Sequence, residues 1–252
     1  VAGAVVIPQA MAYATIADLP AQVGLYTCMV PMLVYALLGG ARTLSVSTTS
    51  TVAVLTGSTL LAAGVAANGD DPAADLATLT IMVGIILVVG RLLKLGGLID
   101  NISEATLVGL KIGVGLTVAA GQLPKLFGVA GNPSAHAFFS EIRGLIDTIG
   151  DINWPTVWLS VATVAILLGL SRVFPRVPAP LVAVALGIVL VQFWSIDDDG
   201  VALIAKVPSG LPAPILPSLD RVGGLVGGAF AIAIMCFLET ASAAGLARRP
   251  DE

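Results

Sequence analysis

Residues 44–64 read LSVSTTSTVAVLTGSTLLAAG, and this stretch decides how the whole chain is interpreted. It opens with a short alternating piece, Leu44 to Ser47, which predicts extended backbone. Four hydroxyl residues follow at positions 48–51, and an apolar run of helical type begins only after them. Serine and threonine are favoured where helices begin, because their side-chain oxygens accept a hydrogen bond from a free backbone N–H group. The stretch therefore predicts a short strand followed by a helix that begins within two residues of Thr49.

The composition of the chain is that of a membrane protein. Of its 252 residues, 57% are apolar and 11% are charged, and the mean hydropathy is +0.99. A soluble domain carries about 25% charged residues. We therefore predict an all-α polytopic membrane protein. In a bilayer, extended backbone is tolerated only where it is buried in protein or lines a watery cavity.

Eight apolar runs approach the length of about 20 residues that crosses a bilayer. They cover 1–17, 26–38, 44–66, 79–93, 105–120, 158–173, 181–194 and 222–247. If these runs alternate in direction, the loop charges sort onto two sides. The bases of one side are Arg42, Arg91, Lys94, Arg172, Arg176, Arg248 and Arg249, whereas the other side holds Lys125, Arg143, Lys206, Arg221 and most acids, Asp75 among them. The positive-inside rule makes the first side cytoplasmic, so both ends of the chain are predicted to be cytoplasmic.

Two interpretations of residues 44–64 remain open on the local sequence alone. The hydroxyl run either caps an ordinary helix at the membrane surface or starts a half-helix near the middle of the membrane. The loop charges favour the half-helix, because Arg42 lies on the cytoplasmic side and the extended piece after it climbs inward. A helix that begins at that depth directs free N–H groups and a partial positive charge at a cavity. Such a helix start can bind an anion without a lysine.

Two polar residues inside the apolar runs are candidates for function. Glu239 is the only acid well inside a run. A carboxylate at that depth is costly and usually faces a cavity, so a site for a coupling ion or proton is favoured over a structural hydrogen bond between helices. Gln9 follows Pro8, which removes one helix hydrogen bond. Its amide either contacts a substrate oxygen or only satisfies the opened backbone.

The remaining candidates predict neither an enzyme nor a metal site. The chain has no Walker-type glycine loop, no HExxH motif and no legible pairing of nucleophile and base. His136 has no second His or Cys nearby, and Cys28 and Cys236 are expected to be small buried apolar side chains. Lys111, inside the fifth run, is expected to snorkel or pair rather than to contact the substrate. We expect no metal, no nucleic-acid partner and no enzymatic activity.

Four stretches resemble the SulP sulfate permeases and their animal relatives, the sulfate-transporter solute carriers. They are IPQAMAYA at 7–14 with GLY at 24–26, RTLSVS at 42–47, GLKIGVGLTVAAGQLPKLFG at 109–128 and VPSGLP at 207–212. The four stretches occur in the family's order and extend over nearly the whole chain.

The resemblance implies a fold of fourteen segments in two inverted repeats of seven, in which the third and tenth are half-helices, each preceded by a short strand. Their N-termini face each other across an anion site. A core domain of segments one to four and eight to eleven moves against a gate domain, and a cytoplasmic STAS domain usually follows. This chain matches segments one to eight, so we expect the remaining segments and the STAS domain to be absent from it. The mapping gives core segments 1–3 at 1–67, core segment 4 at 76–95, gate segments 5–7 at 100–195, an extracytoplasmic loop at 196–221 and core segment 8 at 222–252.

The same resemblance implies which residues form the site. The substrate-binding residues are expected to be Gln9, Ser47, Thr48, Thr49 and Ser50. The ion-coupling residues are expected to be Glu239, Thr240 and Ser242, because Glu239 falls where relatives carry an acid linked to proton or sodium coupling. Relatives often have Gly-Pro in place of Ser47-Thr48, so the anion stays open among sulfate, bicarbonate, a dicarboxylate and chloride.

The expected function is secondary transport of small anions by alternating access, in a bacterial inner membrane. The expected partners are the anion, the lipid bilayer and a second copy in a homodimer of the full-length protein, and the only cofactor is the coupling ion, sodium or a proton. One alternative is an uncoupled anion channel, although a plain pore gains nothing from a buried Glu239. The other is a truncated fragment that does not transport. The chain begins abruptly at Val1 without Met and ends just after an apolar run, so we expect it to be a piece of a longer protein.

Overall fold

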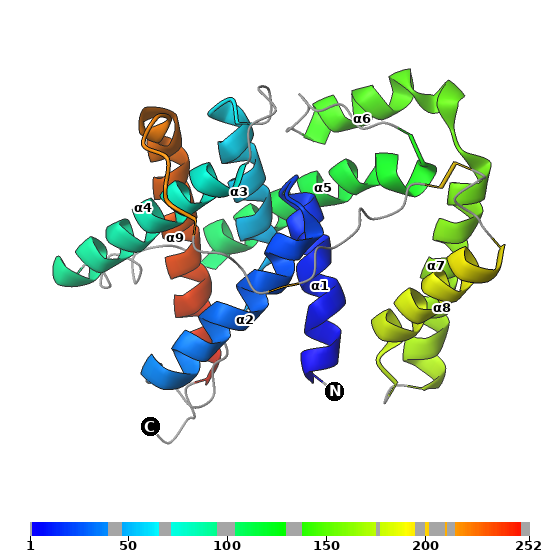
Figure 1. Cartoon of the computed structure of the whole chain (residues 1–252), viewed down its shortest axis with the longest axis horizontal. Helices are drawn as coiled ribbons and strands as arrows, with labels where there is room; N and C mark the ends of the chain where they lie inside the picture. Colours follow the sequence, from blue (N-terminus) through cyan, green and yellow to red (C-terminus); the bar gives the residue numbers. More distant parts are fainter. Residues whose placement is uncertain are drawn as a thin grey trace. The chain divides into compact units, whose positions relative to one another are not determined.

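The computed structural model describes residues 2–39, 47–65, 72–94, 104–129, 138–174, 177–194, 200–201, 210 and 215–247. The regular secondary structure of these residues is entirely helical, which agrees with the predicted all-α class (Figure 1). The helices are α1 (Ala2–Ile16), α2 (Ala21–Leu38), α3 (Ser50–Ala62), α4 (Pro72–Leu92), α5 (Glu104–Phe127), α6 (Phe138–Asp147), α7 (Trp154–Val173), α8 (Ala179–Trp194) and α9 (Val222–Ala247), with a 3-10 turn η3 (Ile149–Asp151) between α6 and α7.

Each of the eight predicted runs overlaps one helix, but several helices begin earlier than the apolar run does. The α7 helix begins at Trp154 rather than at 158, because Asn153 caps it: the Asn153 Oδ1 atom accepts a hydrogen bond from the Thr156 N–H group at 2.9 Å. The α4 helix begins at Pro72 rather than at 79. Proline is favoured at the first position of a helix, because its missing N–H group is not needed there. Hydropathy reports where a helix is apolar, whereas caps decide where it starts.

Four described helices are long and apolar enough to cross a membrane, by length and composition. These stretches are Ala21–Leu38, Pro72–Leu92, Trp154–Val173 and Val222–Thr240, and shorter apolar stretches are Val5–Ile16, Ser50–Ala62 and Ala179–Val191. The α3 helix has only 13 residues, about 20 Å at 1.5 Å per residue, which is short of a hydrocarbon core of about 30 Å. The α3 helix alone is therefore too short to cross the hydrocarbon core, and its start at mid-membrane stays a prediction.

The described chain divides into two compact units. One unit holds residues 1–12 and 115–207, and within it α7 packs along α8. The other holds residues 13–114 and 208–252, and within it α9 packs against both α3 and α4. The divisions between the units fall inside α1 and α5, and the assignment of segments to a core and a gate domain stays a prediction.

The α3, α4 and α9 helices share one buried apolar core in the second unit. Its residues include Leu60 and Val65, Leu79, and Leu225, Ala229 and Ile232. Small residues bring α9 close to α3. A Cβ atom added at Gly228 would collide with the side chain of Thr59, so glycine is needed there for the close approach of the two helices.

Candidate functional site

The start of α3 is the first part of the candidate site. The helix begins at Ser50, and Thr49 is its N-cap residue with extended backbone angles (φ −122°, ψ 151°). This confirms the prediction of a helix start within two residues of Thr49. The first hydrogen bond of the helix runs from Ala53 N to Thr49 O at 3.0 Å, so the N–H groups of Ser50 and Thr51 precede the helical ladder. The strand was predicted at 44–47, of which 44–46 lie outside the described residues, and Ser47 is in no regular element.

A hydrogen bond joins Thr49 to Glu239, which is 190 positions away in the chain. The Thr49 hydroxyl donates to the Glu239 Oε2 atom at 2.9 Å, and the Thr49 Oγ1 atom accepts from Val52 N at 3.4 Å. One hydroxyl therefore caps α3 and holds the carboxylate of α9. Both side chains are half-buried. A carboxylate beside a helix N-terminus is stabilised by the positive end of the helix dipole.

The packing of α9 on α3 explains how the two residues meet. The helices run in opposite directions: Gly224 lies beside Ala63, Gly228 beside Thr59, and Glu239 beside Thr49. A Cβ atom at Gly224 would lie 3.3 Å from the Ala63 Cβ atom. The glycines of the first two turns of α9 therefore allow the close packing that carries Glu239 to the start of α3.

The other predicted residues of the hydroxyl run lie beside Thr49. Ser47 is exposed, whereas Thr48 and Ser50 are half-buried. The Thr48 side chain lies beside Cys28 of α2. The start of α3 thus contacts α2 as well as α9.

Of the remaining predicted site residues, the structure describes the side chains of Thr240 and Gln9. Thr240 is exposed, and its hydroxyl donates to the Cys236 carbonyl of its own helix at 2.7 Å. Ser242 is in α9, but its side chain lies outside the description, as does that of Lys111 in α5; His136 lies outside the described residues altogether. Gln9 is an exposed residue of α1 in the first unit, so its approach to Thr49 and Glu239 stays a prediction.

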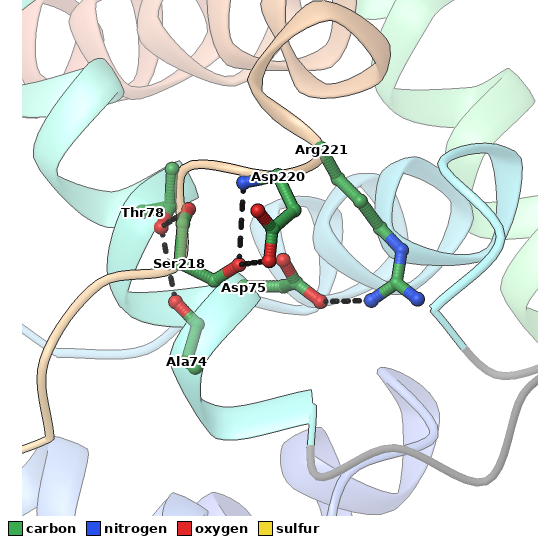
Figure 2. A network of polar contacts seen from close by, with 6 residues as sticks. All are labelled: Ala74, Asp75, Thr78, Ser218, Asp220 and Arg221. Carbon is green, nitrogen blue, oxygen red and sulfur yellow. Dashed lines mark hydrogen bonds and ion pairs between the residues drawn. The ribbon is translucent and has the colours of Figure 1, made fainter.

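A second polar cluster, which the sequence did not indicate, ties α4 to the start of α9 (Figure 2). The Arg221 guanidinium donates to the Asp75 Oδ2 atom at 2.8 Å, and the Asp75 side chain is only 3% exposed. Beside this pair, the Thr78 hydroxyl lies 2.6 Å from the Ser218 carbonyl oxygen and 3.0 Å from that of Ala74. The sequence predicted both Asp75 and Arg221 to lie in loops. For Asp75 this prediction is wrong, because the residue lies in the first turn of α4. The available signal was that each charge stands within a turn of the start of an apolar helix.

Comparison with known proteins assigns the family. Residues 1–250 match the Sulfate permease family. The chain belongs to this family. The match agrees with the predicted resemblance, and a family of permeases agrees with the expectation that the chain is not an enzyme.

Curated relatives of this chain extend well beyond it. A "Probable sulfate transporter" of Mycobacterium tuberculosis (strain ATCC 25618 / H37Rv) is 37% identical over 240 residues, which cover 94% of this chain and 42% of the relative. The "Probable sulfate transporter 3.3" of Arabidopsis thaliana is 31% identical over 219 residues, which cover 82% of this chain and 34% of the relative. The chain spans less than half the length of these relatives.

Solved structures of membrane transporters share the fold. The murine Solute Carrier 26 family member A9 anion transporter, in an inward-facing state, matches with a TM-score of 0.80 at 20% identity over 96% of this chain and 44% of that one. The transmembrane domain of the cyanobacterium bicarbonate transporter BicA matches with a TM-score of 0.79 at 25% identity over 98% of this chain and 65% of that domain. With four long apolar helices among its described residues, the chain is an integral membrane protein of this transporter fold.

Proposed function

We propose that the chain forms part of a secondary active transporter of small anions, in which Glu239 takes part in coupling to sodium or a proton. The observation that carries this proposal is the 2.9 Å hydrogen bond between Thr49 and Glu239 at the start of α3. This bond supports the proposal because it holds the acid of α9 beside the first N–H groups of α3.

Electrostatics gives this placement a mechanism. The positive end of α3 attracts negative charge, and both the Glu239 carboxylate and a substrate anion would compete for it. A sodium ion bound to the carboxylate, or a proton on it, removes the competing charge. The anion then binds better when the coupling ion is present, and by linkage the ion binds better when the anion is present. Thr49, Glu239 and the backbone of the helix start are the groups that would hold the pair.

The substrate is proposed from the class of relatives. Curated relatives are named for sulfate and one structural neighbour for bicarbonate, so these two anions are the first to test, with dicarboxylates and chloride after them. Ser50 and Thr51 offer N–H groups that suit any small oxyanion, and Ser47, Thr48 and Gln9 are the proposed side-chain contacts.

Location, assembly and mechanism complete the proposal. The charges of the loops support a chain with both described ends on the cytoplasmic side of a bacterial inner membrane. We expect alternating access in a homodimer of the full-length protein, with the proposed core segments moving relative to the gate segments. Chemical labelling of single cysteines from each side of the membrane tests the orientation.

The test of coupling uses the full-length protein reconstituted in vesicles. Labelled sulfate, bicarbonate and succinate are supplied with and without a sodium or proton gradient, and exchange of substrate for substrate is measured beside net uptake. Glu239→Gln keeps the shape of the side chain and removes its charge. We expect this variant to lose dependence on the gradient while exchange survives, because exchange needs no net movement of the coupling ion.

Thr49 supplies matched controls. Thr49→Ser keeps the hydroxyl that caps α3 and donates to Glu239, so gradient dependence should remain. Thr49→Val removes the hydroxyl, and the loss of a hydrogen bond to a charged group, worth about 1.5–3 kcal/mol, should weaken coupling roughly tenfold or more. Unchanged gradient dependence in well-folded Glu239→Gln would remove Glu239 from the mechanism. A current that reverses only with the anion gradient would show a channel instead.

A further inference from the structure

The α6 helix is an amphipathic segment that the transport mechanism does not use. Its ten residues, FFSEIRGLID, are too few to cross a bilayer. The apolar residues Phe138, Phe139, Ile142, Leu145 and Ile146 recur at spacings of three and four, which places them along one face of the helix. The opposite face holds the polar and charged residues.

Part of the apolar face of α6 is turned away from the protein, while its other apolar residues, Phe138, Ile142 and Leu145, are half-buried. Phe139 is 83% exposed and Ile146 is 60% exposed, so two large apolar side chains point away from the protein. Glu141, on the polar face, is half-buried and lies beside α5, where a Cβ atom at Gly121 would be 3.6 Å from its Oε1 atom. In water this arrangement would cost the hydrophobic free energy of two large side chains.

The surroundings of α6 indicate what covers its apolar face. The chain continues through an exposed Ile149 into α7, whose first turns carry exposed Trp154 and Trp158. Tryptophan is enriched at the interface between membrane and water, and α7 is long and apolar enough to cross the membrane. Figure 1 shows α6 turned across the direction of α7, as a helix that lies flat on the membrane would be. The exposed apolar side chains of α6 are thus followed in the chain by exposed apolar and aromatic side chains at the start of a candidate membrane span.

We propose that α6 is an interfacial helix that binds phospholipid. Phe139 and Ile146 lie among the upper acyl chains, and the exposed Arg143 beside them meets the phosphate groups. Amphipathic helices of this type sink about 5–10 Å into the boundary between headgroups and acyl chains. The interaction holds the unit that contains α6, α7 and α8 at a constant depth in the bilayer.

The test is nitroxide accessibility in the full-length protein, reconstituted in phosphatidylglycerol and phosphatidylethanolamine vesicles. Single labels are placed by Phe139→Cys and Ile146→Cys, in a background whose native cysteines are replaced by alanine. Asp147→Cys supplies the matched control, because Asp147 is an exposed residue of the same helix on its polar face. Collision with oxygen reports lipid, and collision with a water-soluble nickel chelate reports solvent.

We expect the labels at positions 139 and 146 to collide several-fold more with oxygen than with nickel, and the label at 147 to show the opposite ratio. Equal, high collision with nickel at all three positions would overturn the proposal, because the face would then be in water. Labels at 139 and 146 that are immobile and shielded from both reagents would also overturn it, because protein, from a second copy or another part of the chain, would then cover the face.

Discussion

The buried ion pair between Asp75 and Arg221 should respond unequally to removal of its two partners. Arg221→Gln leaves a carboxylate whose side chain is 3% exposed and whose Oδ1 atom already lacks a hydrogen-bond partner. Asp75→Asn leaves a guanidinium that is 24% exposed and has a further interaction of its own. The arginine variant should therefore be the less stable of the two.

The magnitudes follow from the geometry. Charges 2.8 Å apart attract by about 6 kcal/mol at an effective dielectric constant of about 20, before the cost of desolvation is subtracted. Loss of one partner from a buried pair costs about 3–5 kcal/mol, and Arg221→Gln should fall in that range. Asp75→Asn should cost about 2 kcal/mol, the value of a hydrogen bond to a charged group, because the remaining arginine reaches solvent. The double variant, Asp75→Asn with Arg221→Gln, leaves no buried charge and should recover part of the loss.

Thermal unfolding of the full-length protein in detergent, followed by the amount of monodisperse protein left after heating, measures this order. Arg221→Lys serves as a control, because it keeps the charge without the two-pronged guanidinium geometry and should cost less than Arg221→Gln. The reasoning fails if Asp75→Asn is the more damaging single change. It also fails if the losses of the two single variants simply add in the double variant, because the residues would then act independently.

The same unfolding assay tests two further features of the fold. Gly228→Ala should lower the free energy of unfolding by about 1–3 kcal/mol, because the added Cβ atom collides with Thr59. Gly227→Ala is the control and should not lower it, because nothing lies within 4 Å of the added Cβ atom. Equal effects of the two changes would contradict the close approach of α9 and α3. Asn153→Ala should lower the free energy of unfolding by about 1 kcal/mol through loss of the α7 cap. Asn153→Asp should lower it less, because it keeps an oxygen for the Thr156 N–H group. No effect of Asn153→Ala would contradict the cap.

The start of α3 could be predicted because its signal is local. Four hydroxyl residues before an apolar run mark a helix start in any surroundings, and the helix begins at Ser50 as that rule requires. Glu239 could be singled out for a similar reason, because an acid inside an apolar run is rare. The contact between Thr49 and Glu239 could not be derived from either signal, since it depends on the packing of two helices that are far apart in the chain.

The helix α6 and the burial of Asp75 could not be predicted, because in both cases charged residues interrupt or precede an apolar run. Apolar runs reveal helices that are covered by lipid or protein all round, so α6, whose apolar residues are interrupted by Glu141, Arg143 and Asp147, does not form such a run. Asp75 was assigned to a loop because charges usually lie there. In the structure it is buried in the first turn of α4, where Arg221 compensates its charge.

The α9 helix connects the two polar clusters of its unit. Arg221, just before the helix, is tied to α4, and Glu239 lies 18 residues further on, about 27 Å along the axis at 1.5 Å per residue. Between them, Gly228 sets the register of α9 on α3. Because α9 is continuous from Val222 to Ala247, a sliding movement at one end must move the other end equally. A variant at Arg221 or Gly228 can therefore disturb the Thr49 contact without touching it. Loss of coupling in Glu239→Gln accordingly assigns a role to Glu239 only when the register of α9 on α3 is shown to be intact in that variant.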